Sequence, residues 1–258
     1  MSILKDRIRN KELLCGTHIN INDPSVGVIV GKLGFDYIWI DMEHSYLSYE
    51  NLLNHIIAIQ GCGTPVIVRI PMHDFTAAKK IIEMGPDGVV FPMVRSKEEA
   101  DELISYTLYP PYGNRGFGPH NAVGFGNFNT KEYVANNHKE MCRFIQIEHK
   151  DLVEDLENVI QNPYIDGYIF GPNDLSGSYD MLGDVFSDHI TGVMKDAIAQ
   201  LHAQGKYVGI ASGGFSDEVL QHWSNFGPEM LCAGADFDFI RDGAVRNRIN
   251  LERIHKQR

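Results

Sequence analysis

Three ionisable residues directly follow a strongly apolar stretch near the start of the chain. Residues 37–40 read Tyr-Ile-Trp-Ile, an aromatic and β-branched run typical of a strand that is buried on both faces. Asp41, Glu43 and His44 come immediately after it. A buried strand that ends in this way brings charge to the edge of a hydrophobic core, so the sequence predicts a functional site there.

The same arrangement recurs further along the chain. Arg69 lies near the end of another apolar run, Gln146 and Glu148 alternate with apolar residues at the end of a third, and Asp174 follows a fourth. A helix cap or a surface ion pair would explain any one of them. An unpaired charge within an apolar run is costly, however, and in a barrel the carboxyl ends of the strands carry the active site. We therefore expect these side chains on one rim.

The residue types at this rim indicate metal-assisted chemistry. Glu148 and Asp174 are hard oxygen ligands that suit Mg²⁺ or Mn²⁺. His44 could be a third ligand and would then favour zinc. A general base is the preferred interpretation, because Asp41 and Glu43 beside it can orient the ring and stabilise the imidazolium. Arg69 offers two parallel donors for a carboxylate or a developing oxyanion.

The positions of the lysines argue against imine chemistry. A Schiff-base enzyme needs a lysine buried at the rim. Lys206 precedes a predicted strand and so belongs to the opposite end of the sheet. Lys150 is the one near candidate, expected in the first turn after the strand that ends in Glu148. Enolate chemistry assisted by a metal therefore fits the chain better.

These residues need a fold that brings distant strand ends together, and the chain repeats a suitable unit. Each unit of about 25 to 30 residues contains a strand, a short loop, a helix and a terminating glycine, a pattern typical of a parallel sheet. Eight units predict a (β/α)8 barrel, a TIM barrel in the α/β class. A doubly wound open sheet is the alternative, but no phosphate-binding glycine pattern follows the first strand. The expected strands are 13–18, 37–41, 65–70, 88–93, 143–148, 166–171, 207–211 and 230–234.

The bulk composition limits the classes of protein that the chain can represent. Its 258 residues show no linker, so we expect one domain spanning 1–258. A formal net charge of −11 argues against nucleic acid or an anionic membrane as a partner, and no apolar run is long enough to span a bilayer. Cys15, Cys142 and Cys232 lie in apolar runs and are expected to be buried free thiols, which indicates the reducing cytoplasm. The glycine- and proline-rich stretch at 109–129 predicts a long functional loop.

In combination these motifs resemble the HpcH/HpaI aldolases, which are class II, pyruvate-dependent enzymes. The resemblance runs from about residue 13 to 240. The matching segments are Asp-Met-Glu-His at 41–44, Arg69, Gln-Ile-Glu at 146–148, Gly-Pro-Asn-Asp-Leu-Ser at 171–176 and the Tyr-Pro-Pro loop from 109 to 118.

The resemblance implies a barrel of the phosphoenolpyruvate/pyruvate type whose last helix is exchanged between subunits, commonly in a hexamer built as a trimer of dimers. It implies Mg²⁺, Mn²⁺ or Co²⁺ on Glu148 and Asp174, with a 2-oxo acid such as pyruvate and an aldehyde as partners. It further implies substrate contacts from Gln146, Asn173 and Asp174. His44 would be the acid/base and Arg69 would stabilise the pyruvate enolate, while a carboxylate at Glu83 would raise the basicity of the histidine.

Three functions follow as hypotheses. The first is a lyase that reversibly cleaves a 4-hydroxy-2-oxo acid into pyruvate and an aldehyde through a metal-bound pyruvate enolate. The second keeps the enolate chemistry but decarboxylates an oxaloacetate-type acid or condenses the enolate with another acceptor. The third is a non-catalytic barrel that binds a small acid. The aldehyde-binding half departs from the family pattern, since Asn121-Ala122-Val123 replaces a usual arginine region and Asn173 a common alanine.

Overall fold

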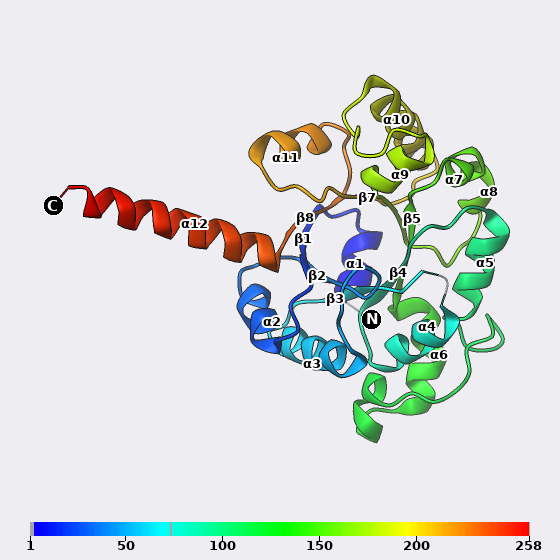
Figure 1. Cartoon of the computed structure of the whole chain (residues 1–258). Coiled ribbons are helices and arrows are strands. Elements are labelled where there is room, and N and C mark those ends of the chain that lie inside the picture. The colour runs from blue at the N-terminus through cyan, green and yellow to red at the C-terminus, as the bar shows by residue number, and fades with distance from the viewer. Residues whose placement is uncertain (1–2, 73, 258) are drawn as a thin grey trace.

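Eight parallel strands close into a barrel in the computed structural model, which describes residues 3–72 and 74–257. Each strand pairs with the next along the chain, and β8 pairs with β1 (Figure 1). This confirms the (β/α)8 barrel and excludes the open doubly wound sheet. The strands are β1 (Leu14–Ile19), β2 (Tyr37–Asp41), β3 (Val66–Arg69), β4 (Gly88–Phe91), β5 (Cys142–Ile147), β6 (Gly167–Phe170), β7 (Val208–Ala211) and β8 (Met230–Ala235).

Helices surround the barrel, and short polar caps define where many of them begin. Ser48, Ser96 and Ser216 each accept a hydrogen bond from a backbone N–H in the first turn of the helix that follows. The helices are α1 (Ile3–Arg9), α2 (Pro24–Gly31), α3 (Tyr49–Gln60), α4 (Phe75–Glu83), α5 (Lys97–Ser105), α6 (Thr130–Glu140), α7 (Lys150–Glu154), α8 (Leu156–Val159), α9 (Pro172–Ser178), α10 (Asp188–Ala203), α11 (Asp217–Ser224) and α12 (Asp236–His255), with a 3₁₀ segment η1 (Asn121–Gly126).

The core has two layers, one inside the barrel and one between the strands and the helices. Tyr37, Trp39 and Phe144 fill the interior together with Leu4 and Ile8 of α1. Helix α1, which the sequence analysis did not predict, therefore belongs to the interior cluster. Its Lys5 ammonium lies 2.6 Å from Asp166, just before β6, so α1 lies at the amino-terminal end of the strands. That end is closed, and the opposite end is left for the site.

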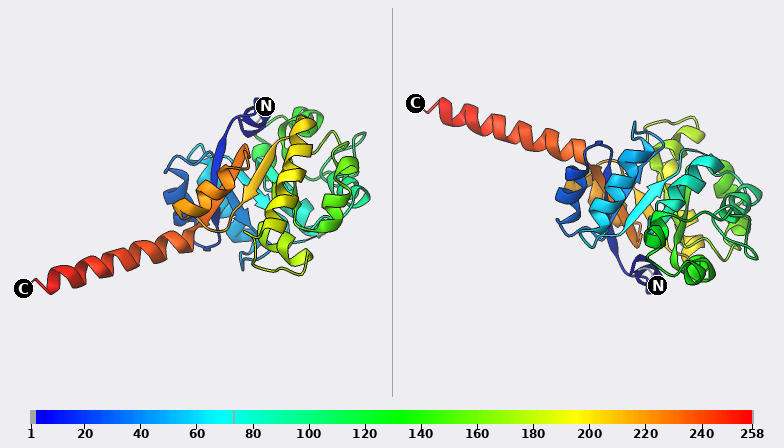
Figure 2. Two further views of the ribbon diagram at one scale, coloured as in Figure 1. Left: turned by 90° about the horizontal axis from the view of Figure 1, so that it is seen from above. Right: turned by 90° about the horizontal axis from the view of Figure 1, so that it is seen from below.

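The last helix, α12, projects away from the rest of the molecule (Figures 1 and 2). Of its residues, only Asp236 at its start is buried. Several apolar side chains along it are about half exposed, among them Ile240, Val245, Ile249 and Ile254. No helix in the described part of the chain is long and apolar enough to cross a membrane.

The cysteines correct one detail of the sequence analysis. All four are free, and Cys142 and Cys232 are buried as expected. Cys15 is exposed, so the prediction of a buried thiol was wrong there. It alternates with the buried Leu14 and Gly16 along β1 and faces the outside of the barrel. The cytoplasmic location inferred from these thiols stays a prediction.

Candidate active site

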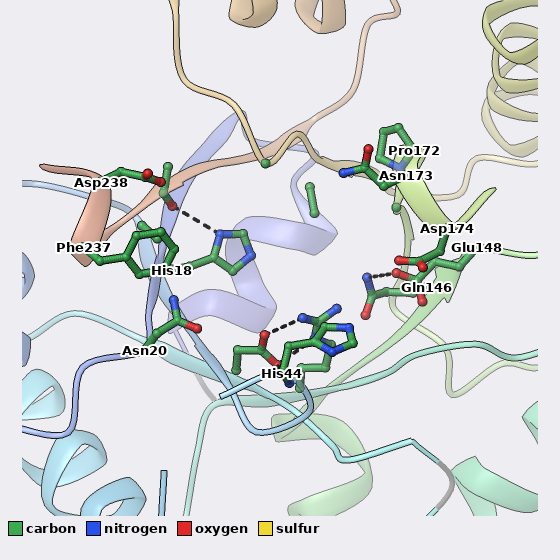
Figure 3. A pocket seen from close by; sticks show the side chains of 17 residues that line it. His18, Asn20, His44, Gln146, Glu148, Pro172, Asn173, Asp174, Phe237 and Asp238 are labelled. Carbon is green, nitrogen blue, oxygen red and sulfur yellow. Dashed lines mark hydrogen bonds and ion pairs between the residues drawn. The ribbon is translucent and has the colours of Figure 1, made fainter. Parts of the chain in front are cut away.

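A pocket of about 360 Å³ opens at the carboxyl ends of the strands (Figure 3). Its walls come from β1, β2, β3, β5, β6, β7 and β8 and the segments that follow them. The side chains predicted for the rim therefore gather in one cavity, as expected for the catalytic end of a barrel. The lining includes His18, Asn20, Asp41, His44, Arg69, Gln146, Glu148, Asn173, Asp174, Phe237 and Asp238.

The Asp41 carboxylate forms a hydrogen-bonded ion pair with Arg69. The two residues are neighbours in the β2–β3 register, and Asp41 accepts hydrogen bonds from both Nε (2.9 Å) and Nη2 of Arg69. It also accepts the backbone N–H groups of Glu43 (2.9 Å) and His44 (3.3 Å). Burial alone would raise the pKa of Asp41, but these hydrogen bonds and the guanidinium charge lower it overall.

Glu43, rather than Asp41, lies next to the His44 ring. Its Oε2 is 3.7 Å from His44 Nε2 and 3.3 Å from Arg69 Nη1. The expectation that Asp41 orients the imidazole therefore needs correction, because Asp41 fixes only the backbone turn on which His44 stands. The His44 side chain is 66% exposed and lies at the mouth of the pocket, where a general base can exchange its proton with water.

The contacts of Arg69 with neighbouring carboxylates leave part of its guanidinium unused. Its contacts with Asp41 and Glu43 use three N–H directions, so two of the five donors of a guanidinium have no partner among the described residues and are available to a ligand. The guanidinium carbon also lies 5.9 Å from the centre of the Trp39 ring. With a side chain that is 12% exposed, Arg69 is a fixed cation aimed at the cavity.

Glu148 is the most deeply buried carboxylate of the site, with 2% exposure. It accepts hydrogen bonds from the Met93 backbone N–H (3.0 Å) and from Gln146 Nε2 (2.7 Å). Met93 adopts a positive φ of 53°, a strained conformation that directs this N–H toward the carboxylate. Burial raises the pKa of Glu148 to about 8, with a further contribution from Asp174.

The structure fits a divalent cation at Glu148 and Asp174. Asp174 stands in the first turn of α9 and faces the same cavity. Gln146 Oε1 is buried and has no hydrogen-bond partner in the described part of the chain, so a donor is missing beside Glu148. A nearby cation with its water shell would satisfy this oxygen and favour ionised Glu148. Over the described residues no group of three or more His, Cys, Asp or Glu is arranged to hold a metal, so these carboxylates would supply only part of the coordination.

The position of Gly171 explains how Glu148 fits beneath the α9 turn. A Cβ atom on Gly171 would lie 2.3 Å from Glu148 Oε1. Gly171 has an ordinary φ of −106°, which any residue type could adopt. Glycine is therefore required at this position by lack of space and not by backbone strain. The carboxylate therefore occupies space that any other residue type at 171 would take.

Glu83 lies outside this cavity. It ends α4 and forms an ion pair with Arg115 of the long loop, with 3.0 Å between Oε1 and Nη2. Arg115 is buried and packs 4.3 Å from the Tyr109 ring centre. In the described single chain Glu83 is thus part of the anchor of the 109–129 loop, away from His44. Lys150 lies in α7, and the pocket lining within the described residues includes no lysine.

The sequence analysis did not predict four polar or aromatic side chains that line the pocket: His18, Asn20, Phe237 and Asp238. His18 lies near the end of β1, so the strand-end rule that selected Arg69 could have selected it. Phe237 and Asp238 gave no such signal, because they open a helix of mixed composition. Asp236 connects the two segments, since its carboxylate accepts the backbone N–H groups of Asn20 (3.0 Å) and Ile21 (2.8 Å).

Comparison with known proteins places this site in a family. A family model described as HpcH/HpaI aldolase/citrate lyase matches residues 15–222. The chain belongs to this family. Its membership confirms the resemblance derived from the sequence motifs and makes the chain an aldolase-type lyase of class II.

The similarity to individual members extends over nearly the whole chain. A hydroxypyruvate/pyruvate aldolase from Roseovarius nubinhibens is 26% identical over 90% of each chain. A 4-hydroxy-2-oxovalerate aldolase from Novosphingobium aromaticivorans is 28% identical over 98% of this chain and 96% of its own. The solved structure of an HpcH/HpaI aldolase from Desulfitobacterium hafniense matches with a TM-score of 0.89 at 24% identity, over 98% of this chain and 97% of that one. This last likeness concerns the fold.

Proposed function

We propose that this chain cleaves 4-hydroxy-2-oxo acids reversibly to pyruvate and an aldehyde. One observation supports this most: a single pocket collects an arginine with spare donors, two oxygen ligands and a histidine at its mouth. Cleavage of such an acid needs a base for the 4-hydroxyl proton and positive charge for the enolate that leaves. The pocket offers both without a lysine among its described lining residues, so an imine intermediate is not required.

We assign the proton transfer to His44. In the cleavage direction its imidazole takes the proton of the 4-hydroxyl group, the C3–C4 bond breaks, and the electron pair moves to the C2–C3 unit as the enolate of pyruvate. The carbonyl of the aldehyde forms at C4. The Glu43 carboxylate lies 3.7 Å from the ring, next to the positive charge that develops on it during this step. In the condensation direction His44 returns the proton to the new hydroxyl group.

We assign stabilisation of the enolate oxygen to Arg69. Its free N–H groups and fixed charge favour the enolate more than the neutral ketone, which is the requirement for a lower barrier. Asp41 holds the guanidinium in one orientation through two hydrogen bonds, so it acts as a positioning residue.

We propose that Glu148 and Asp174 hold a divalent cation, in keeping with the metal dependence general in the family. Mg²⁺, Mn²⁺ and Co²⁺ are the candidates. When bound, such an ion acts as a Lewis acid toward a 2-oxo acid. Gln146 and Asn173 would orient the substrate through their amides. Glu83 pairs with Arg115, so we propose no direct contact between Glu83 and His44 within one chain.

We further propose a homo-oligomer, a hexamer built as a trimer of dimers, in which α12 is exchanged between subunits. The support is the projecting helix and its half-exposed Ile240, Val245, Ile249 and Ile254 (Figure 2). Sedimentation at micromolar concentration should give a species several times larger than the 29.0 kDa chain. A stable monomer would refute the exchange.

The proposed activity can be tested with pyruvate, a panel of aldehydes and Mg²⁺, Mn²⁺ or Co²⁺, with products identified by mass. We expect adducts with the mass of pyruvate plus aldehyde, and no covalent protein adduct after borohydride treatment. An adduct trapped on Lys150 would overturn the metal assignment. Turnover of oxaloacetate without any aldol product would favour the rival decarboxylase.

A further inference from the structure

One wall of the pocket has no part in the mechanism proposed above. It comes from β1, the end of β8 and the start of α12, and it contributes His18, Asn20, Phe237 and Asp238. The residues assigned to pyruvate and the cation come instead from β3, from β5 and the position after it, and from α9. In Figure 3 the two groups lie on opposite sides of the cavity, with His18 extending between them. A second substrate bound beside pyruvate would meet this wall.

His18 presents a hydrogen-bond acceptor to that space. Its Nδ1 lies 3.3 Å from the backbone carbonyl oxygen of Gly234, which can only accept, so the proton of a neutral ring belongs on Nδ1. Burial lowers the pKa of His18 to about 4, with the charge of Arg69 acting in the same direction, so the ring is neutral near pH 7. Its Nε2 then carries a lone pair, and its one partner within the described chain is the weak thiol donor of Cys232 at 3.7 Å. The Trp39 ring, 5.2 Å away between centres, packs against the imidazole.

Asn20 adds an amide that is free to bind. Its backbone N–H is held by the buried carboxylate of Asp236, which also binds Ile21 and the N–H of Phe237. These bonds fix the turn after β1. The side-chain amide of Asn20 has no hydrogen-bond partner in the part of the chain that is described, and it lines the pocket as both donor and acceptor.

The charge of the cavity disfavours an anionic second substrate. Asp41, Glu148, Asp174 and Asp238 all line it, and Arg69 is the one Lys or Arg side chain among the described lining residues. The divalent cation proposed for Glu148 and Asp174 would balance those two charges, so the uncompensated carboxylate is that of Asp238. Asp41 already pairs with Arg69. Pyruvate itself adds a further negative charge. The Asp238 carboxylate lies 3.0 Å from Arg241, but that arginine is 61% exposed and lies outside the pocket lining.

We infer that the aldehyde substrate is small, uncharged and hydroxylated, with its hydroxyl group bound by His18 Nε2 and Asn20. This inference rests on the proposed aldolase function and specifies its acceptor. A hydroxyl group can donate to Nε2 and accept from the Asn20 amide at the same time, whereas a methyl group leaves both unpaired. The 360 Å³ cavity has room for pyruvate and a few further carbon atoms.

The test compares three aldehydes with pyruvate: glycolaldehyde, propanal and glyoxylate. Glycolaldehyde and propanal have the same number of heavy atoms and differ in a hydroxyl against a methyl group, and glyoxylate carries a carboxylate. For the unmodified protein we expect kcat/KM to be roughly tenfold higher with glycolaldehyde than with propanal, and lowest with glyoxylate. This comparison needs no variant and so does not depend on the folding of one.

Two variants test whether His18 and Asn20 cause the preference for glycolaldehyde over propanal. His18→Phe keeps an aromatic ring but removes Nε2, and Asn20→Ala removes the amide. Each should reduce the glycolaldehyde-to-propanal ratio by roughly three- to tenfold. The matched control is His189→Phe, the same substitution on the exposed surface of α10, which should leave the ratio unchanged. Asp238→Asn should raise kcat/KM for glyoxylate relative to glycolaldehyde by about threefold, because a like charge near the substrate is removed.

Exchange of the pyruvate methyl protons in D₂O separates the two ways in which the inference can fail. Aldol products formed with equal efficiency from glycolaldehyde and propanal, or a ratio that His18→Phe and Asn20→Ala leave unchanged, would overturn the acceptor assignment while the aldolase function stands. Methyl exchange with no aldol product from any aldehyde would refute the aldolase function, and the acceptor assignment with it.

Discussion

Replacing Asp41 by Asn should destabilise the barrel more than the loss of an ordinary surface ion pair would. The Asp41 side chain is 6% exposed and accepts four hydrogen bonds, two of them from Arg69. Breaking a buried pair by removing one partner costs about 3–5 kcal/mol. In Asp41→Asn, Arg69 still pairs with Glu43 at 3.3 Å, so the cost should lie at the lower end of this range. We expect a loss of about 3 kcal/mol in the free energy of unfolding.

The chain contains a matched control for this experiment. Arg7 also pairs with two carboxylates, Glu12 at 2.7 Å and Asp36 at 2.8 Å, but Glu12 is 43% exposed. Glu12→Gln should therefore cost less than about 1 kcal/mol. Urea unfolding followed by circular dichroism, at equal protein concentration, measures both losses. Equal losses in Asp41→Asn and Glu12→Gln would refute the argument from burial.

The pH dependence of the stability difference between the unmodified protein and Asp41→Asn tests the role of the Asp41 charge. Folding lowers the pKa of Asp41 below its ordinary value of 3.8. Its contribution is thus fully present above about pH 4, and it is lost as the pH falls through the lower value of the folded state. The gap in stability between the unmodified protein and Asp41→Asn should be constant from pH 7 to 5 and should narrow in more acidic solution. A gap that widens there would contradict the assigned direction of the shift.

Three further predictions follow from the pocket. EDTA should abolish aldol activity, and Mg²⁺, Mn²⁺ or Co²⁺ should restore it; full activity after exhaustive chelation would refute the cation at Glu148 and Asp174. Because His18 is neutral in the folded state but binds a proton below about pH 6.5 when unfolded, its own contribution should disfavour folding as the pH falls; the free energy of unfolding of the unmodified protein minus that of His18→Phe should therefore decrease by about 2–3 kcal/mol between pH 7 and 4.5, and a constant difference would contradict the assigned shift. Gly171→Ala should displace Glu148 and raise the metal concentration needed for half-maximal activity, whereas Gly192→Ala on α10, where a Cβ meets nothing within 4 Å, should not; equal metal requirements would show that the close contact is unimportant.

The barrel and its rim could be predicted from the sequence because each depends on local patterns. Apolar runs that end in charge, such as the one leading to Asp41, located β2 and its neighbours to within one or two residues. Parallel pairing of consecutive strands then placed Asp41 opposite Arg69. The same reasoning predicted that Glu148 and Asp174 lie on one rim although they are 26 positions apart in the chain, and both line the pocket.

The details that failed depend on contacts that no local pattern encodes. Of the two carboxylates predicted to orient His44, Glu43 lies next to the ring, whereas the Asp41 carboxylate is hydrogen-bonded to Arg69 instead. Cys15 is exposed because its side of β1 faces outward, which an apolar run that includes it does not reveal. Phe237 and Asp238 reach the pocket only because Asp236 ties the start of α12 to the turn after β1.

The measurement that tests the proposed mechanism most directly compares aldol cleavage with oxaloacetate decarboxylation in His44→Ala and Arg69→Ala. Both reactions pass through the pyruvate enolate, but only cleavage requires removal of a hydroxyl proton. A general base contributes about 10²- to 10⁴-fold, and a donor to a developing oxyanion about 10²- to 10³-fold. At saturating metal, we predict that His44→Ala loses most of kcat/KM for cleavage while keeping much of any decarboxylase activity, and that Arg69→Ala loses both. Equal losses of the two reactions in His44→Ala would contradict the assignment of His44 as the base.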